Sequence, residues 1–205
     1  LTTAIYQLPF GGAQRFARTS NRTLNAVIGG WQLSNIIELQ SGPWLTPYFN
    51  GGDPSGTGIG TFGGRNSFPD HVGPAYPGSQ NADQWFLTSG FVCPGGNCLA
   101  GTSAANPPIG RFGDAGIGTL EGPGTIDWDL GLTKSFRLTE RARLKVEVSF
   151  VNVLNHVNLG QPDMKITDVN NPAQGECGFG CITAAQGLYE FAGAREGQVG
   201  ARIDF

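Results

Sequence analysis

Apolar and polar residues alternate along several stretches of this sequence, with the period of two that a β-strand requires. The clearest stretch is residues 125–156. Apolar residues occupy alternate positions on both sides of a short turn at Leu138-Thr139-Glu140, and mostly charged or small residues lie between them. This pattern predicts a β-hairpin with one apolar face and one polar face.

Residues 1–8, 23–46 and 188–205 form three further predicted strands. In the second of them, Trp31 and Ile37 fall on one face, and polar residues fill most positions of the other face. The third alternates as far as its last residue. Together with the hairpin, these stretches predict about five strands.

A sheet with one apolar and one polar face is typical of a soluble β-sandwich or of an outer-membrane barrel. The connections at 50–123 and 159–187 are long and rich in glycine, whereas the other two are shorter. Barrels combine short periplasmic turns with long extracellular loops, and very long loops are uncommon in compact soluble domains. We therefore predict an all-β fold of antiparallel up-and-down strands, with residues 1–205 forming a single partial segment of an outer-membrane β-barrel.

The composition agrees with a loop-rich β protein. Charged residues make up 14%, glycine contributes 33 residues, and the formal net charge is -3. Lys and Arg do not gather in a basic patch, which argues against a nucleic-acid partner. The chain begins at Leu1 without an initiator Met or an export signal, so we expect any such signal upstream.

The four cysteines form two close pairs in glycine-rich sequence: Cys93 with Cys98, and Cys177 with Cys181. We predict that each pair forms a small disulfide in an exposed loop, which requires an oxidising compartment. A four-thiolate zinc site is the alternative, because the spacing within each pair also suits zinc ligands. The loops carry no other metal-site signal, so we predict neither a metal nor a cofactor.

The polar face predicted for the sheet carries charged residues from four strands. They are Glu38, Asp127, Asp129, Arg143, Lys145, Glu147, Arg202 and Asp204. Cross-strand charge pairing on a water-filled face explains them best. If the chain were an enzyme, Asp127 or Asp129 with Glu147 would be the carboxylate pair of a glycoside hydrolase. The histidines, His71 and His156, do not belong to a recognisable catalytic triad, because the sequence contains no G-x-S-x-G motif.

Four blocks of the sequence resemble the C-terminal end of TonB-dependent outer-membrane receptors. They are 24–47 (LNAVIGGWQLSNIIELQSGPWLTP), 84–91 (QWFLTSGF), 110–162 (GRFGDAGIGTLEGPGTIDWDLGLTKSFRLTERARLKVEVSFVNVLNHVNLGQP) and 195–205 (REGQVGARIDF). The third block is the most specific. The resembling subgroup is the Oar-like receptors of Acidobacteria, which carry a carboxypeptidase-regulatory-like domain.

The resemblance implies a slice of a barrel of about 22 strands in the outer membrane of a Gram-negative bacterium. Such receptors import a scarce small ligand with energy from the TonB system. Their terminal signal for the barrel-assembly machinery is similar to Gln198, Gly200, Ile203 and Phe205. The fragment itself is expected to have no activity of its own.

Two alternatives remain open at this stage. One is a soluble, secreted or periplasmic β-sandwich-like protein that binds or hydrolyses carbohydrate. The other is a β protein that self-assembles into a homo-oligomer through its free strand edges.

Overall fold

The computed structural model describes the whole chain except residues 12–13, 17–20, 51–52, 59–65, 97–108 and 187–192. It divides into two compact units. The sheet unit contains Leu1–Gln40, Thr125–Asn158 and Gly187–Phe205, and the loop unit contains Ser41–Gly124 and Leu159–Gln186. Across the described ranges, no helix is long and apolar enough to cross a membrane.

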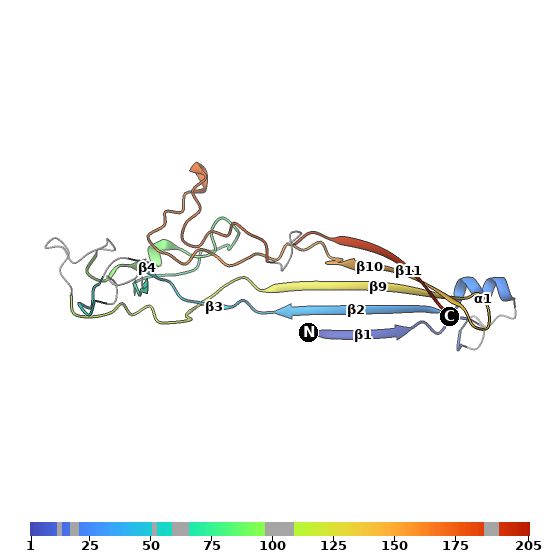
Figure 1. Cartoon of the computed structure of the whole chain (residues 1–205). Helices are drawn as coiled ribbons and strands as arrows, with labels where there is room; N and C mark the ends of the chain where they lie inside the picture. The colour runs from blue at the N-terminus through green and yellow to red at the C-terminus, as the bar shows by residue number, and fades with distance from the viewer. Residues whose placement is uncertain (12–13, 17–20, 51–52, 59–65, 97–108, 187–192) are drawn as a thin grey trace. The chain divides into compact units, whose positions relative to one another are not determined.

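Five antiparallel strands form the sheet unit, and they confirm the predicted all-β, up-and-down fold. Their order in the sheet is β1-β2-β9-β10-β11, with β1 and β11 at the two edges (Figure 1). The strands are β1 (Thr2–Gln7), β2 (Trp31–Gln40), β9 (Thr125–Arg137), β10 (Arg143–Val151) and β11 (Glu196–Asp204).

The strand register sorts the side chains onto two faces. Leu33, Leu132, Val148 and Val199 pair in one row across four strands, so they share a face. We call this the apolar face; the alternate positions form the polar face. Among the described residues, none of the apolar side chains on the apolar face is buried, and Val199 is 77% exposed. Nothing in the described part of the chain therefore covers the apolar face completely.

The two ends of the sheet differ in their connections. At one end, β9 and β10 are joined by a tight turn, in which the N–H groups of Leu138 and Thr139 both donate to the Ala142 oxygen at 3.0 and 3.1 Å. The turn therefore extends two residues beyond the predicted Leu138-Glu140. We call this end the turn end. At the other end, β2 runs into the first long loop and β10 into the second, so we call it the loop end.

A short helix replaces the first part of the strand predicted at 23–46. Helix α1 (Arg22–Ile28) begins after Asn21, whose Oδ1 accepts hydrogen bonds from the N–H groups of Thr23 and Leu24 at 3.0 and 3.2 Å. It ends at Gly29, and Gly30 then adopts a positive φ of 74° before β2 starts. The prediction was wrong here because a capping asparagine and a glycine pair outweigh the β-prone residues between them.

The last strand is also shorter than predicted. It spans Glu196–Asp204 instead of 188–205, and residues 188–192 lie outside the described part. The alternation within it is as expected, because Val199 pairs with Val148 and Arg202 pairs with Lys145.

The loop unit is held by three small two-stranded sheets. These pair β3 (Trp44–Leu45) with β8 (Leu120–Glu121), β4 (Phe49–Asn50) with β5 (Asn66–Ser67), and β6 (Asp70–His71) with β7 (Phe91–Val92). Short 3-10 turns occur at Thr88–Gly90, Pro94–Gly96 and Pro172–Gln174. The predicted strand at 23–46 therefore also ends early, since β2 stops at Gln40 and β3 pairs elsewhere.

The hydrophobic core lies in the loop unit. Phe49 and Phe86 are fully buried, and Phe179 comes from the second long loop to pack against Phe86 and Phe91, with ring centroids 6.1 and 5.5 Å apart. Burial of such a ring contributes about 1.5–3 kcal/mol. The long connections therefore fold onto one another around their aromatic residues.

Candidate functional site

All eight charged residues predicted for the polar face lie on that face. Glu38 pairs with Asp127, Arg143 with Asp204, and the remaining members alternate with apolar residues along their strands. The side chain of Arg202 forms an ion pair with Asp204 at 2.6 Å. The structure therefore collects these residues from β2, β9, β10 and β11 into one polar wall.

Charge is segregated along this wall. The turn end carries four basic residues and one acidic residue: Arg137, Arg143, Lys145, Arg202 and Asp204. From the row of Glu147 to the loop end, the strands carry acidic residues and no basic ones: Glu38, Asp127, Asp129, Glu147 and Glu196. The wall therefore presents positive charge at one end and negative charge along the rest.

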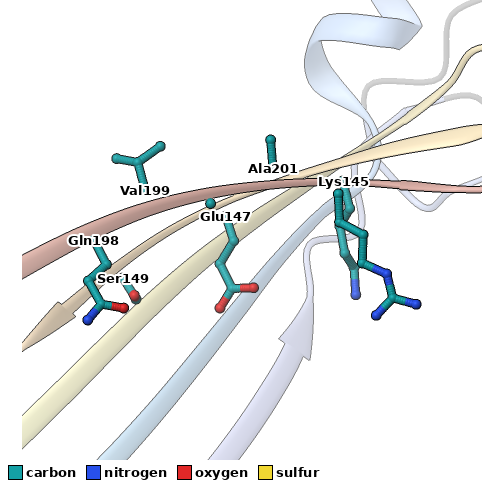
Figure 2. Close-up of a pocket in the computed structure, with 8 residues that line it drawn as sticks. Lys145, Glu147, Ser149, Gln198, Val199 and Ala201 are labelled. Carbon is teal, nitrogen blue, oxygen red and sulfur yellow. The ribbon is translucent and has the colours of Figure 1, made fainter.

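A shallow hollow lies on the polar wall between β10 and β11. It measures about 420 Å³, and Lys145, Glu147, Ser149, Gln198 and Arg202 are among its lining residues. Figure 2 shows Glu147 and Gln198 pointing to one side of the sheet and Val199 and Ala201 to the other. Gly200 pairs with Glu147, and a Cβ at Gly200 would meet no atom within 4 Å. The missing side chain leaves this part of the wall open.

The polar wall does not assemble the carboxylate pair of a glycosidase. Glu147 pairs with Thr133, and Asp129 lies four residues farther along β9. At ~3.4 Å per residue, this separates the two positions by about 14 Å, well beyond the ~5–5.5 Å of a retaining enzyme. Asp127 is farther away still. The geometry therefore gives no support to the hydrolase alternative.

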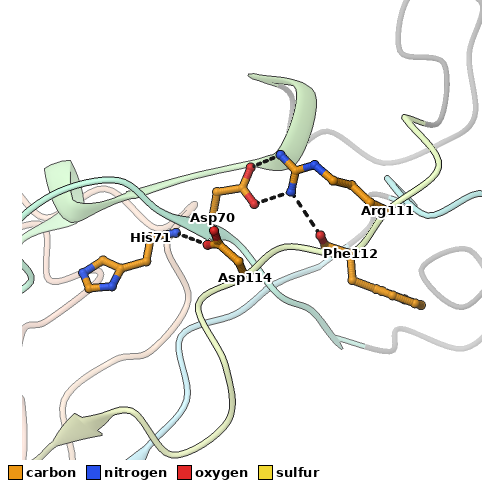
Figure 3. Close-up of polar contacts among 5 residues, drawn as sticks. All are labelled: Asp70, His71, Arg111, Phe112 and Asp114. Carbon is orange, nitrogen blue, oxygen red and sulfur yellow. Dashed lines mark hydrogen bonds and ion pairs between the residues drawn. The ribbon is translucent and has the colours of Figure 1, made fainter.

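An ion pair fixes the loop unit near one of its small sheets. Arg111 Nη1 and Nη2 donate to the two carboxylate oxygens of Asp70 at 2.6 and 2.7 Å, and Asp114 accepts from the His71 N–H at 2.8 Å (Figure 3). The hydrogen bonds from Arg111 hold the pKa of Asp70 below its ordinary value, and the same bonds raise the pKa of Arg111. The His71 ring stacks on Phe91 with centroids 5.1 Å apart, which is a packing role.

The predicted disulfide between Cys177 and Cys181 is present, with the Cα atoms 5.3 Å apart. Cys93 is also disulfide-bonded, whereas Cys98 lies outside the described residues. Closed disulfides leave no thiolates at Cys93, Cys177 and Cys181, which excludes the four-thiolate zinc site. Among the described residues, no three His, Cys, Asp or Glu side chains are grouped to hold a metal ion.

A second hollow of about 440 Å³ lies beside this disulfide, within the loop unit. Tyr48, Gln161, Asp163 and Thr183 contribute polar groups to its lining, and Met164 contributes an apolar, polarizable one. Such a mixed lining suits a small polar ligand with an apolar part.

The sequence did not predict several buried side chains that hydrogen-bond the backbone of other segments. Lys134 lies on the apolar face, where it is buried. Its Nζ donates to the backbone oxygens of Val27 (2.9 Å) and Gly29. Asn152 is buried where the chain leaves β10, and its side chain hydrogen-bonds the backbone of His156 and Gly193. Asn152 also has a positive φ of 49°. Of these residues, only Lys134 had a signal in the sequence, because it interrupts the alternation of apolar residues at 126–136.

The side chain of Asn158, like that of Asn152, hydrogen-bonds to backbone groups, here at the start of β9. Its Oδ1 accepts from the Ile126 N–H at 2.8 Å, and its Nδ2 donates to the Ile126 oxygen at 3.1 Å. Of the predicted terminal signal, Gln198 and Gly200 lie on the polar face, Ile203 lies on the apolar face, and Phe205 follows β11 with 97% of its surface exposed.

Comparison with known proteins supplies the family. Residues 1–198 match the family described as outer membrane beta barrel domain. Neither curated proteins nor solved structures gave a match. The match covers four strands of the sheet, the first residues of β11 and both long loops, and it agrees with a sheet whose apolar face is not completely covered. The chain therefore belongs to the outer membrane β-barrel domain family, and its place is the outer membrane.

Proposed function

We propose that this chain supplies five neighbouring strands of a TonB-dependent receptor, and that the parent protein imports a scarce small ligand. One observation carries the proposal: an uncovered apolar face and a charged face are separated on the same five-stranded meander. Lipid on one side and a water-filled lumen on the other require this separation. The four sequence blocks that resemble such receptors support the finer assignment.

The proposal fixes an orientation. The turn end faces the periplasm and the loop end faces the outside, so both long loops meet the medium that supplies the ligand. Five strands cannot close a barrel, for which about eight is the practical minimum. In a membrane, the outer edges of β1 and β11 also need hydrogen-bond partners. We propose that further strands of the parent barrel pair with both edges.

The polar wall then lines the lumen. Within the lumen, a ligand that comes from the outside passes Glu38, Asp127 and Asp129 before it reaches the basic row of Lys145 and Arg202 near the periplasm. This order favours entry of a cationic or neutral ligand over an anionic one. The hollow beside the Cys177–Cys181 disulfide is the proposed first contact for the ligand. No catalytic step is proposed, because the candidate carboxylates lie too far apart.

The parent protein can be tested for coupling to TonB. Extracted from outer membranes in detergent, it should bind the purified periplasmic domain of TonB, measured by surface plasmon resonance. A variant of the parent without its TonB-contacting segment is the matched control and should not bind. An intact parent protein that folds as a barrel and shows no TonB binding would contradict the transport proposal, while its membership of the barrel family would stand.

The edges of β1 and β11 favour one competing arrangement, in which copies of the chain pair with each other. The mass of the detergent-extracted protein distinguishes the two cases. A mass of one polypeptide supports closure by strands of the same chain. A multiple of that mass, together with cross-links between cysteines placed at Ala4 and Val199, would replace it with a homo-oligomer.

A further inference from the structure

We propose that the hollow between β10 and β11 binds a small zwitterion, a molecule whose ammonium and carboxylate groups lie about 7 Å apart, as in a free dipeptide. The inference takes from the proposed function only that the polar wall lines a water-filled lumen. It needs neither TonB nor transport, because it concerns binding at equilibrium.

Three rows of the strand register form the polar lining of this hollow. Lys145 pairs with Arg202, Glu147 with Gly200, and Ser149 with Gln198. Successive rows are two residues apart, which is about 6.8 Å along an antiparallel strand. The hollow therefore has a cationic row towards the turn end, an acidic row in the middle and a neutral polar row towards the loop end.

The cationic row carries more positive charge than its neighbours neutralise. Lys145 lies directly opposite Arg202, and like charges in this arrangement destabilise a sheet. Asp204 pairs with the Nε of Arg202 at 2.6 Å, while the Arg202 side chain stays 79% exposed. In the part of the chain that the structure describes, Lys145 has no hydrogen-bond or ion-pair partner. A carboxylate bound between the two cations removes their repulsion and accepts charge-assisted hydrogen bonds from both.

Glu147 supplies the opposite charge one row away. Its carboxylate forms no hydrogen bond or ion pair with any described residue, although the cationic row is adjacent. Gly200, directly opposite, has no side chain, and a Cβ there would meet no atom within 4 Å, so this space is open to a ligand. Figure 2 shows Glu147 and Gln198 on the same side of the sheet. Glu147 can therefore bind an ammonium group, and the Gln198 amide can hydrogen-bond to a peptide group beside it.

The spacing and the signs of these charges select the ligand class. An extended chain spans at most about 3.3–3.6 Å per residue, so a dipeptide separates its two charged ends by about the distance between the rows. The hollow of about 420 Å³ lies within the size range of small-molecule sites. A simple anion is repelled by Glu147, and a simple cation is repelled by Lys145 and Arg202. A molecule with both charges is attracted at both ends.

The test measures how defined peptides protect one thiol in the hollow. Ser149→Cys is introduced into the complete parent barrel, which is extracted in detergent and kept without reductant so that the disulfides stay closed. Its reaction rate with a small, water-soluble methanethiosulfonate reagent is followed by mass spectrometry of the fragment that contains residue 149. Alanyl-alanine at millimolar concentration should slow the reaction about threefold or more. N-acetyl-alanyl-alanine and alanyl-alanine amide, which each lack one charge, should give little protection.

Matched variants show whether the hollow is responsible. In the Ser149→Cys protein, Glu147→Gln and Lys145→Gln should each reduce the protection by alanyl-alanine. Glu38→Gln and Arg137→Gln remove the same charges from the polar wall outside the hollow, and they should leave the protection unchanged.

A distant thiol and a second labelling position complete the experiment. Gln7→Cys, on the polar face of β1, should react at the same rate with and without alanyl-alanine. If Ser149→Cys does not fold, Gln198→Cys takes its place. Absence of protection in folded protein, equal protection by alanyl-alanine and its amide, or protection that survives Glu147→Gln would each overturn the proposal. A parent protein that binds TonB and shows no protection would overturn this inference alone and leave the proposed function standing.

Discussion

The Nζ of Lys134 lies 4.9 Å from the centre of the Trp31 ring, on the apolar face of the sheet. The Phe136 ring lies on its other flank, with the ring centre 5.2 Å away. Two aromatic faces and two backbone oxygens of the α1 end therefore surround one ammonium group. This arrangement lets a cation lie among the side chains of the apolar face.

Replacing Lys134 with Met should loosen α1. The variant keeps the length and the apolar stem but loses both hydrogen bonds to the helix end, which we expect to cost about 1–3 kcal/mol. Hydrogen exchange of the amides in 22–30 should accelerate, while exchange in β10 stays slow. Lys145→Met, on the polar wall, is the matched control. Equal exchange rates for the two variants would contradict the assigned role of Lys134.

The two faces can be distinguished with neighbouring residues of β10. Val148→Arg places a charge on the apolar face, which we propose meets lipid, and should lower the free energy of unfolding by about 2–4 kcal/mol. Ser149→Arg places the same charge on the polar wall and should change it by less than about 1 kcal/mol. Urea unfolding of the barrel in vesicles measures both values. The opposite order would mean that the polar face meets lipid.

The Asp70–Arg111 ion pair should make the loop unit sensitive to acid. The hydrogen bonds from Arg111 lower the pKa of Asp70 below its ordinary 3.8. The ion pair therefore contributes its full stabilisation above pH 3.8, and this stabilisation is lost as the pH falls through the lowered pKa. Arg111→Gln should destabilise the loop unit only modestly at neutral pH, since Arg111 itself is half exposed and solvent screens the ion pair.

Limited proteolysis of the loops as a function of pH provides the measurement. The difference between the native protein and Arg111→Gln should be constant at neutral pH and should shrink as the pH falls below 3.8. Arg195→Gln controls for the removal of one positive charge outside the loop unit. A difference that persists unchanged in acid would show that Arg111 acts through packing.

Gly113 should tolerate no side chain. A Cβ at this position would lie 2.0 Å from the Phe68 oxygen and 2.3 Å from the Pro69 oxygen, both fixed in the backbone. We expect Gly113→Ala to destabilise the loop unit by about 1–3 kcal/mol. Gly78→Ala is the control, because a Cβ at Gly78 meets nothing within 4 Å. Thermal unfolding followed by near-UV circular dichroism compares the two, and equal midpoints would contradict the tight fit.

The alternation of apolar and polar residues predicted the five strands of the sheet and their faces, although the bounds of two strands were wrong. Val148 and Glu147 fall on opposite faces of any strand, whatever the surroundings, because side chains alternate along the backbone. The close spacing of Cys177 and Cys181 likewise pointed to their disulfide. These features depend on neighbours in the sequence, so the sequence predicts them.

Helix α1 shows where local reading fails. Asn21 and Gly29-Gly30 mark a helix start and end, but the residues between them also suit a strand that continues into Trp31. Lys134, more than a hundred residues away, supplies the contacts that hold the C-terminal end of the helix against the sheet. The pattern of residues 22–30 alone therefore cannot predict the contact with Lys134.

By itself, the sequence determined the antiparallel meander, its two faces and the loop cysteine pair at 177 and 181, because these follow from periodicity and spacing. Only the tertiary structure decided that Phe49, Phe86 and Phe179 share one core, that Asp70 pairs with Arg111, and that Glu147 lies far from Asp129. Each of these features depends on contacts between segments that are far apart in the sequence. Burial of apolar surface and strand register determine those contacts, and both act across the whole fold.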